Sequence, residues 1–260
     1  MALTLETTTP DVLSLDEFVN YVERNVDVED FHQLCELAPM WSALLNNRGL
    51  ISNVVARELQ RWRDFQDGNS YVGTTLILAR SRKFFIRANM WVPIGSDNGT
   101  YGVTHDHNFS FLTGGYAGNG YTTEIYRLED GYAAKQPGQR VRLEFQERTT
   151  LPRGKIMVYH AAQDVHRQNR PNDFSISINL MVPKEIRERP QFYYDLDRST
   201  VTGCSFSEEG RTLALFKLAQ FVADEQTKML LFDITETSSN QHVRAAAKSA
   251  LDSILEAHSP

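Results

Sequence analysis

The spacing of apolar residues along this chain changes twice. Across residues 14–72, apolar side chains recur every three or four positions, as on one face of an α-helix. Across residues 73–205, short runs rich in β-branched and aromatic residues alternate with Gly, Pro, Asn and Asp turns. Helical spacing returns across residues 206–260. The pattern predicts a mainly β protein with helical flanks: a disordered lead-in (1–13), an N-terminal helical segment (14–72), an antiparallel β-barrel or sandwich (73–205) and a C-terminal helical segment (206–260).

Helix signals can be located in both flanks. Ser14 and Glu17 form a capping box that starts the first helix. A second helix is predicted over 28–37, with Pro39 soon ending it, and a third over 50–65. Near the other end, helices are predicted over 212–223, 226–234 and 239–257. The last resembles one helix of a HEAT-type repeat, but a single repeat cannot bury its own apolar face. We therefore expect the C-terminal helices to pack on the barrel.

The middle segment contains only extended runs. Strands are predicted over 74–80, 83–92, 108–113, 121–128, 139–145, 155–159 and 174–182. Alternation within 83–92 places Phe85, Arg87, Asn89 and Trp91 on one face of the sheet.

Composition narrows the range of partners. A net charge of −6 disfavours nucleic acid, since phosphate binding needs a basic surface. The two cysteines, Cys35 and Cys204, do not suggest a disulfide framework, which favours a reducing cytoplasm. No apolar run is long enough to cross a bilayer and no signal peptide is evident, so we expect a cytoplasmic protein without a membrane partner.

Histidines carry the clearest chemical signal. His105 and His107 stand one residue apart in an extended context, so their side chains point the same way. His166 or His160, on a later strand, would supply a third imidazole. Imidazole binds Fe, Zn, Cu and Ni alike, so the ligand type does not choose the metal.

The arrangement of these residues resembles the cupin superfamily. Residues 102–107 (Gly-Val-Thr-His-Asp-His) match the start of its first motif, and the turn 152–154 (Pro-Arg-Gly) followed by His166 matches its second. The register of the second motif favours His166 over His160. Phe111 and Leu112 occupy the place of the motif's glutamate. The resemblance therefore implies a double-stranded β-helix barrel with three histidine ligands and no carboxylate, as in the thiol dioxygenase branch, whose members bind Fe(II).

Other positions depart from that branch. No cysteine follows the His-Asp-His string, and Asn179 and Met181 stand near the places where cysteine dioxygenases have a histidine and a tyrosine. Cysteine itself is therefore not the expected substrate. Three further residues are candidates for catalytic roles: Arg87 as a clamp for a substrate carboxylate, Glu124 as an alternative fourth ligand, and Asn179 as a polar lining group.

These observations predict a mononuclear non-heme iron oxygenase. Its substrate would be a small polar molecule that chelates the metal and reacts with dioxygen. Zn, Ni or Mn remain open as metals, and no organic cofactor is evident, because no dinucleotide fingerprint or P-loop is present. The alternatives are a cupin metalloenzyme that does not use dioxygen (an isomerase, lyase or hydrolase) and a non-catalytic small-molecule-binding cupin. Dimerisation is frequent among cupins, so the resemblance leaves a homodimer open.

Overall fold

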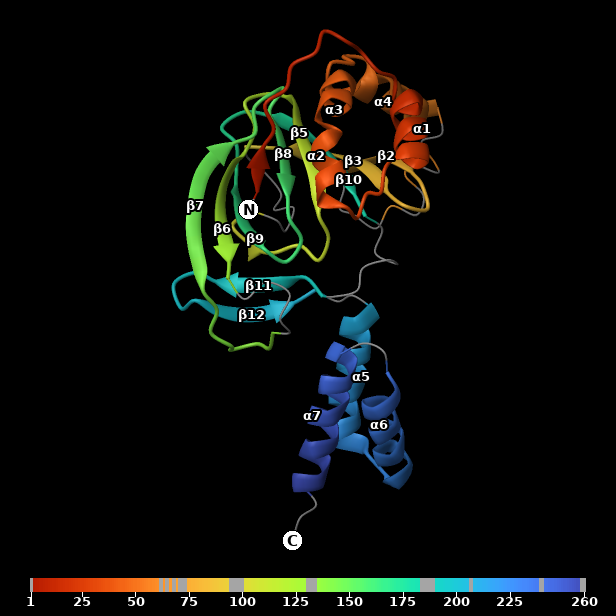
Figure 1. Cartoon of the computed structure of the whole chain (residues 1–260), viewed down its shortest axis with the longest axis vertical. Helices are drawn as coiled ribbons and strands as arrows, with labels where there is room; N and C mark the ends of the chain where they lie inside the picture. Colours follow the sequence, from red (N-terminus) through yellow and green to blue (C-terminus); the bar gives the residue numbers. More distant parts are fainter. Residues whose placement is uncertain are drawn as a thin grey trace.

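The computed structural model describes residues 2–60, 63, 66, 69, 74–93, 101–129, 135–182, 190–205, 208–238 and 241–257. Figure 1 shows three parts in chain order: a group of N-terminal helices, two β-sheets facing each other, and a C-terminal group of helices at one end of the sheets.

The N-terminal helices cover one face of the first sheet. They are α1 (Leu15–Asn25), α2 (Phe31–Glu36), α3 (Ala38–Leu45) and α4 (Leu50–Gln60). The predicted capping box starts α1: the Glu17 N–H donates to the Ser14 hydroxyl (3.2 Å), and the Ser14 N–H donates to the Glu17 carboxylate (2.8 Å). Helix α2 ends at Glu36, shortly before Pro39 as predicted. Pro39 itself lies in the first turn of α3, where the N–H that proline lacks has no partner within the helix.

Two six-stranded antiparallel sheets form the barrel. The first has the order β1 (Leu3–Thr4), β8 (Ile156–Tyr159), β5 (Phe111–Ala117), β10 (Ser175–Met181), β3 (Phe85–Trp91), β2 (Thr75–Arg80). The second has the order β12 (Thr200–Cys204), β11 (Phe192–Asp195), β4 (Thr104–His105), β9 (Asp164–Asn169), β6 (Thr122–Leu128), β7 (Leu143–Thr150).

The path of the chain through these sheets is that of a double-stranded β-helix. From β3 to β10 the chain passes repeatedly from one sheet to the other, and strands distant in sequence become neighbours: β3 with β10 and β5 with β8 in one sheet, β4 with β9 in the other. This is the jelly-roll arrangement of cupins. The predicted fold class, a cupin-type barrel with helical flanks, is confirmed.

Alternation decides which residues of the first sheet face the barrel interior. On β5, Gly114 faces the helices, and a Cβ atom there would lie 2.5 Å from Leu45 Cδ1 and 2.7 Å from Trp41 Nε1. Tyr116, on the same face, donates its hydroxyl to two backbone carbonyls after α3, at 2.9 Å each. Thr113 and its alternate neighbours on β5 therefore point into the barrel.

The structure corrects the prediction for residues 1–13. Instead of a disordered lead-in, Leu3 and Thr4 form β1 and pair with Val158 and Met157 of β8, and Ala2 is buried. The free edge of β8 offers backbone hydrogen bonds that the short N-terminal strand completes. Composition alone could not reveal this pairing, because the strand is only two residues long.

The C-terminal helices differ from their predicted place. Helices α5 (Glu208–Val222), α6 (Glu225–Thr237) and α7 (Gln241–Ala257) form a small bundle, in which α5 and α6 pack on α7 (Figure 1). Among the described residues, the core of this bundle consists of its own side chains: Phe216, Leu231, Ala247, Ala250 and Ile254. The expectation that these helices pack on the barrel was therefore wrong.

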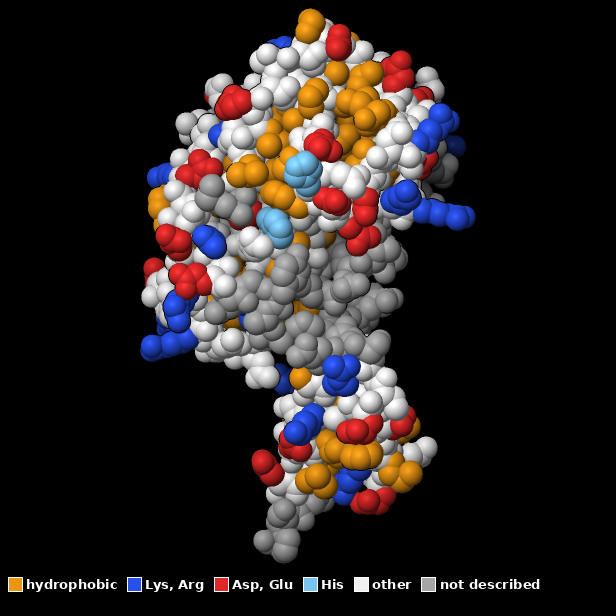
Figure 2. Space-filling model, in the orientation of Figure 1, with side chains coloured by type: hydrophobic (Ala, Val, Ile, Leu, Met, Phe, Trp, Pro, Cys, Tyr) orange, Lys and Arg blue, Asp and Glu red, His pale blue; other side chains and the backbone are white. Residues whose placement is uncertain are grey.

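The C-terminal bundle also leaves many apolar side chains in solvent, and Figure 2 shows hydrophobic atoms on its visible face. The exposed ones are Leu215, Leu218, Phe221, Val222, Met229, Leu230, Phe232 and Leu255. None of the described helices combines the length and the apolar character needed to cross a membrane.

Candidate metal centre

Two neighbouring strands of the second sheet bring three histidines together. His105 ends β4 and pairs directly with His166 of β9, and His107 follows two residues later. The Nε2 atom of His166 lies 3.1 Å from that of His105 and 3.2 Å from that of His107. All three side chains are buried. The predicted convergence of His105, His107 and His166 is therefore present in the structure.

The surroundings of His105 fix which of its nitrogens is free. Its Nδ1 lies 3.0 Å from the carbonyl oxygen of Val103, which can only accept a hydrogen bond, so Nδ1 carries the proton. Nε2 of the neutral ring then presents a lone pair to the other two histidines. A ligand histidine that donates its second N–H to a carbonyl is the usual arrangement around protein-bound metals.

Burial favours the uncharged form of His105 and His166. Desolvation lowers the pKa of His105, with a smaller contribution from the positive charge of Arg87. Desolvation also holds the pKa of His166 well below its ordinary value, and the proximity of His105 lowers it further. Neutral imidazoles are the form that binds metal ions, so no proton has to be displaced near neutral pH.

The spacing of the three nitrogens suits one cation. Metal–nitrogen bonds of about 2.1 Å place neighbouring ligand nitrogens roughly 3.0–3.4 Å apart, depending on the ligand–metal–ligand angle. The observed separations of 3.1 and 3.2 Å fall in that range. The donor set thus fits a divalent metal ion bound by three neutral ligands.

The two sides of the cluster differ in polarity. On one side, aromatic rings pack against the histidines: Phe111 lies 4.6 Å from His107 and Tyr159 lies 4.9 Å from His166, measured between ring centroids. Phe111 and Tyr159 also stack on each other at 4.8 Å. Burial raises the pKa of Tyr159 well above its ordinary value, so its hydroxyl stays protonated and this wall carries no charge.

The other side of the cluster is polar and is built by residues on β3, β5 and β10. Asn179 of β10 stands opposite both Arg87 of β3 and Thr113 of β5, and the Thr113 hydroxyl donates to its side-chain oxygen at 2.5 Å. Burial raises the pKa of Tyr121 to about 12, against smaller effects of hydrogen bonds with Gln168 and Thr113 and of the nearby Arg87 charge. Arg87 pairs with Asn179 and therefore faces the barrel interior with it, where its charge acts on both Tyr121 and His105.

Two candidates for the ligand set lie outside the cluster. The ring of His160 packs on Phe31 of α2 at 4.6 Å, on the outer side of the barrel. Glu124 accepts hydrogen bonds from Arg167 at 2.5 and 3.0 Å and lies 3.9 Å from Arg148. Its neighbour on β6, Ile125, is the residue paired with His166, so Glu124 is directed to the opposite face of the sheet. The structure does not bring Glu124 to the histidines as a fourth ligand.

The sequence did not predict the residues that form hydrogen bonds with Asp106, the middle residue of the His-Asp-His string. The N–H of Phe192 and the hydroxyl of Tyr194 both donate to Asp106, at 2.6 and 2.9 Å. These partners come from β11, which follows the charged residues 184–189 and was not predicted as a strand. The alternation in Phe192-Tyr193-Tyr194-Asp195 is too short to distinguish from a loop.

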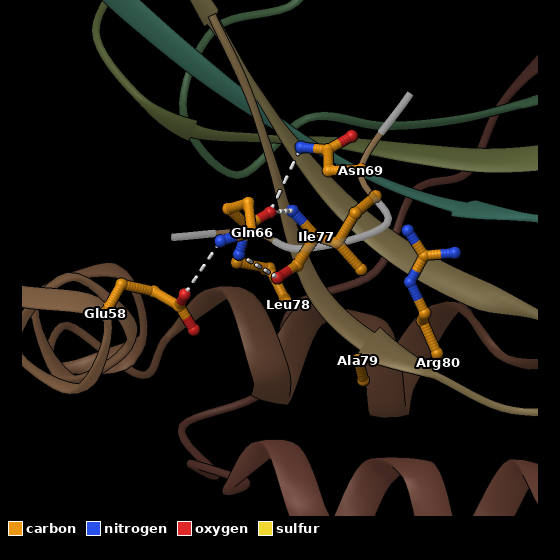
Figure 3. A pocket seen from close by; sticks show the side chains of 7 residues that line it. All are labelled: Glu58, Gln66, Asn69, Ile77, Leu78, Ala79 and Arg80. Atoms are coloured by element: carbon orange, nitrogen blue, oxygen red, sulfur yellow. Dashed lines mark hydrogen bonds between the residues drawn. The ribbon is translucent and has the colours of Figure 1, made fainter. Parts of the chain in front are cut away.

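A separate cavity of about 170 Å³ lies at the outer edge of the first sheet (Figure 3). It is lined by Glu58, Gln66, Asn69, Ile77, Leu78, Ala79 and Arg80. The Gln66 side chain accepts from the Ile77 N–H (2.6 Å) and donates to the Ile77 carbonyl (3.2 Å), so it completes the hydrogen bonds of the edge strand β2. This cavity contains none of the histidines, and the side chains of Glu58 and Asn69 both form hydrogen bonds with Gln66.

No protein-family model and no curated protein matches the chain. Among solved structures, it is similar to hydroquinone 1,2-dioxygenase PnpCD, crystallised with Cd²⁺ and 4-hydroxybenzonitrile (TM-score 0.31, 11% identity, covering 47% of this chain and 75% of that one). It is also similar to a Klebsiella pneumoniae protein with a double-stranded β-helix domain (TM-score 0.28, 10% identity, covering 49% of this chain and 90% of that one). A third similar structure is a Bordetella pertussis cupin domain (TM-score 0.25, 7% identity, covering 42% of this chain and 91% of that one).

The strand order and the histidines of the chain itself carry the resemblance. Together, the double-stranded β-helix and the three-histidine cluster at its interior confirm the resemblance to the cupin superfamily.

Proposed function

We propose that this chain is a mononuclear non-heme iron oxygenase acting on a small, polar, metal-chelating molecule. The observation that carries the proposal is the convergence of three imidazoles, His105, His107 and His166, in a buried site without a carboxylate among the ligands. Neutral ligands leave the full charge of a divalent ion uncompensated. Such a centre favours an anionic chelator as substrate.

A ferrous ion in this site would supply adjacent open positions for the substrate and for dioxygen. The chain's own side chains determine which molecule enters. Arg87 offers a guanidinium on the polar side of the cluster, which suits bidentate binding of a carboxylate. Asn179, across from Arg87, orients the bound polar group.

The aromatic side of the site has a different role in the proposal. Phe111 and Tyr159 shield His107 and His166 and so limit the access of water to the reacting atoms. A polar substrate then lies between the arginine side and the aromatic side, with its chelating group toward the histidines. This arrangement extends the resemblance to thiol dioxygenases, but with a substrate other than cysteine.

The test begins with protein purified without oxygen and loaded with Fe(II). Nitric oxide replaces dioxygen, and electron paramagnetic resonance records the iron–nitrosyl signal in the presence of small thiol, hydroxyl or catechol chelators with and without a carboxylate. We expect carboxylated chelators to change the signal of the wild type, and Arg87→Met to abolish that preference. Substrate-dependent oxygen consumption then identifies the reaction.

Two results would contradict the proposal. A protein that retains no iron, and whose His105→Ala variant is indistinguishable from the wild type, has no metal centre at these residues. Turnover that proceeds equally well without oxygen would instead support an isomerase, lyase or hydrolase that uses the metal as a Lewis acid.

A further inference from the structure

The strand that carries the His-Asp-His string is very short. β4 contains only Thr104 and His105, so the backbone ladder ends before His107. Gly102, just before it, adopts a left-handed conformation with φ of 73°. The carbonyl of His107 accepts one hydrogen bond, from the N–H of Ala162 at 2.8 Å. Ladder pairing therefore holds the first histidine firmly and the second one weakly.

Asp106, between the two histidines, connects this part of the chain to the neighbouring strand β11. Its backbone N–H donates to the Phe192 carbonyl (3.1 Å), while its carboxylate accepts from the Phe192 N–H (2.6 Å) and from the Tyr194 hydroxyl (2.9 Å). The carboxylate thus takes the place of a strand carbonyl and extends the pairing between β4 and β11. Asp106 is fully buried, and Phe192 and Tyr194 are buried as well, so water does not compete for these bonds.

The hydrogen bonds of Asp106 to Phe192 and Tyr194 form a clamp, and the strand geometry links this clamp to the histidines on the other face of the sheet. Side chains alternate along an extended chain, so fixing Asp106 toward β11 directs both of its neighbours toward His166. The residue between the two clamp partners, Tyr193, pairs directly with His105. Movement of Asp106 away from β11 would therefore rotate His105 and His107 together.

We propose that Asp106 is a positioning residue for the metal centre, and that its hydrogen bonds to Phe192 and Tyr194 of β11 set the affinity for the metal. This inference rests on the proposed metal site at the three histidines. It assigns a role in metal binding to a strand that supplies no ligand. Loss of groups that orient ligands typically weakens metal binding about 10- to 100-fold.

The experiment measures the dissociation constant for Co²⁺ by competition with a chelator, and the visible absorption of the bound ion. The variants are Tyr194→Phe, which removes one clamp bond, Asp106→Asn, which keeps an acceptor, and Asp106→Ala, which removes both. Tyr126→Phe is the matched control, because it removes a tyrosine–carboxylate hydrogen bond (to Glu124, 3.2 Å) on the same sheet but away from the string. Circular dichroism establishes that each variant is folded at the working temperature.

We expect the dissociation constant to rise several-fold for Tyr194→Phe and about 10- to 100-fold for Asp106→Ala, with Asp106→Asn between them and Tyr126→Phe unchanged. The Co²⁺ absorption bands should broaden or shift in the same order. If Asp106→Ala does not fold, Tyr194→Phe decides alone.

Three results would overturn the inference. One is an unchanged affinity in Tyr194→Phe and Asp106→Ala, even with reduced stability. Another is a Co²⁺ affinity that falls as far in Asp106→Asn as in Asp106→Ala but stays normal in Tyr194→Phe. The carboxylate would then act through its charge and not through its hydrogen bonds. The third is a wild type that binds no Co²⁺, which also removes the proposed metal centre.

Discussion

Replacing His166 by alanine should abolish metal-induced stabilisation, whereas replacing His160 should leave it intact. The two histidines are six positions apart and both stand near the place of the second cupin motif. In the structure the Nε2 of His166 is within 3.2 Å of both other ring nitrogens, while the ring of His160 packs on Phe31 outside the barrel. The pair is thus a matched test of the ligand assignment.

The size of the effect follows from linkage between binding and folding. At a free Co²⁺ concentration about 100 times the dissociation constant, binding adds roughly 2.7 kcal/mol to the stability of the folded state. For a folded unit of this size, each kcal/mol raises the melting temperature by about 2–4 °C, so the wild type should melt about 5–10 °C higher with metal. His160→Ala should show the same increase from its own starting value.

Tryptophan fluorescence is the appropriate assay. All three tryptophans precede the C-terminal bundle, so the signal follows the barrel and its N-terminal helices without a contribution from unfolding of the bundle. A His166→Ala variant that retains the full shift, or a His160→Ala variant that loses it, would refute the assignment.

Other features of the barrel lead to further predictions. Metal-free protein should lose stability as the pH falls below about 6.5. Burial keeps His105 and His166 neutral in the folded state, whereas the same histidines take up protons in the unfolded chain. Urea unfolding midpoints that rise as the pH falls would contradict this prediction. Gly115→Ala should lower the free energy of unfolding in urea by about 3 kcal/mol, because a Cβ atom there would contact the Pro152 carbonyl. Gly203→Ala, with open space around it, should be nearly neutral. Equal effects of the two substitutions would contradict the packing. Glu124→Gln should cost about 1 kcal/mol through its ion pair and leave the Co²⁺ affinity unchanged, and a large loss of affinity would restore Glu124 as a ligand.

Local patterns were sufficient for the parts of the fold that have a strong period. The alternation in residues 83–92 predicted β3 and placed Arg87 on the same face as Asn89, and the capping box predicted the start of α1. The His-Asp-His string together with the later His166 predicted the cluster, because one-residue spacing places two side chains on the same face of an extended chain.

Features that depend on pairing between distant segments could not be predicted. The two-residue strands β1 and β4 have no period of their own and exist because a neighbouring strand offers free backbone groups. Glu124 was ambiguous for the same reason: only the register between β6 and β9 reveals that Arg167 stands opposite it. The C-terminal helices have apolar residues on more than one side, so periodicity could not determine which face they bury.

The position of β11 has a consequence for synthesis of the protein. The histidine ligands occupy positions 105–166, but the strand that flanks β4 on its other side begins at Phe192. Because a growing chain leaves the ribosomal exit tunnel in sequence order, all three imidazoles emerge before the strand that flanks β4. Secure capture of a metal ion then belongs to the late stage of translation, after the segment containing Tyr194 has left the exit tunnel.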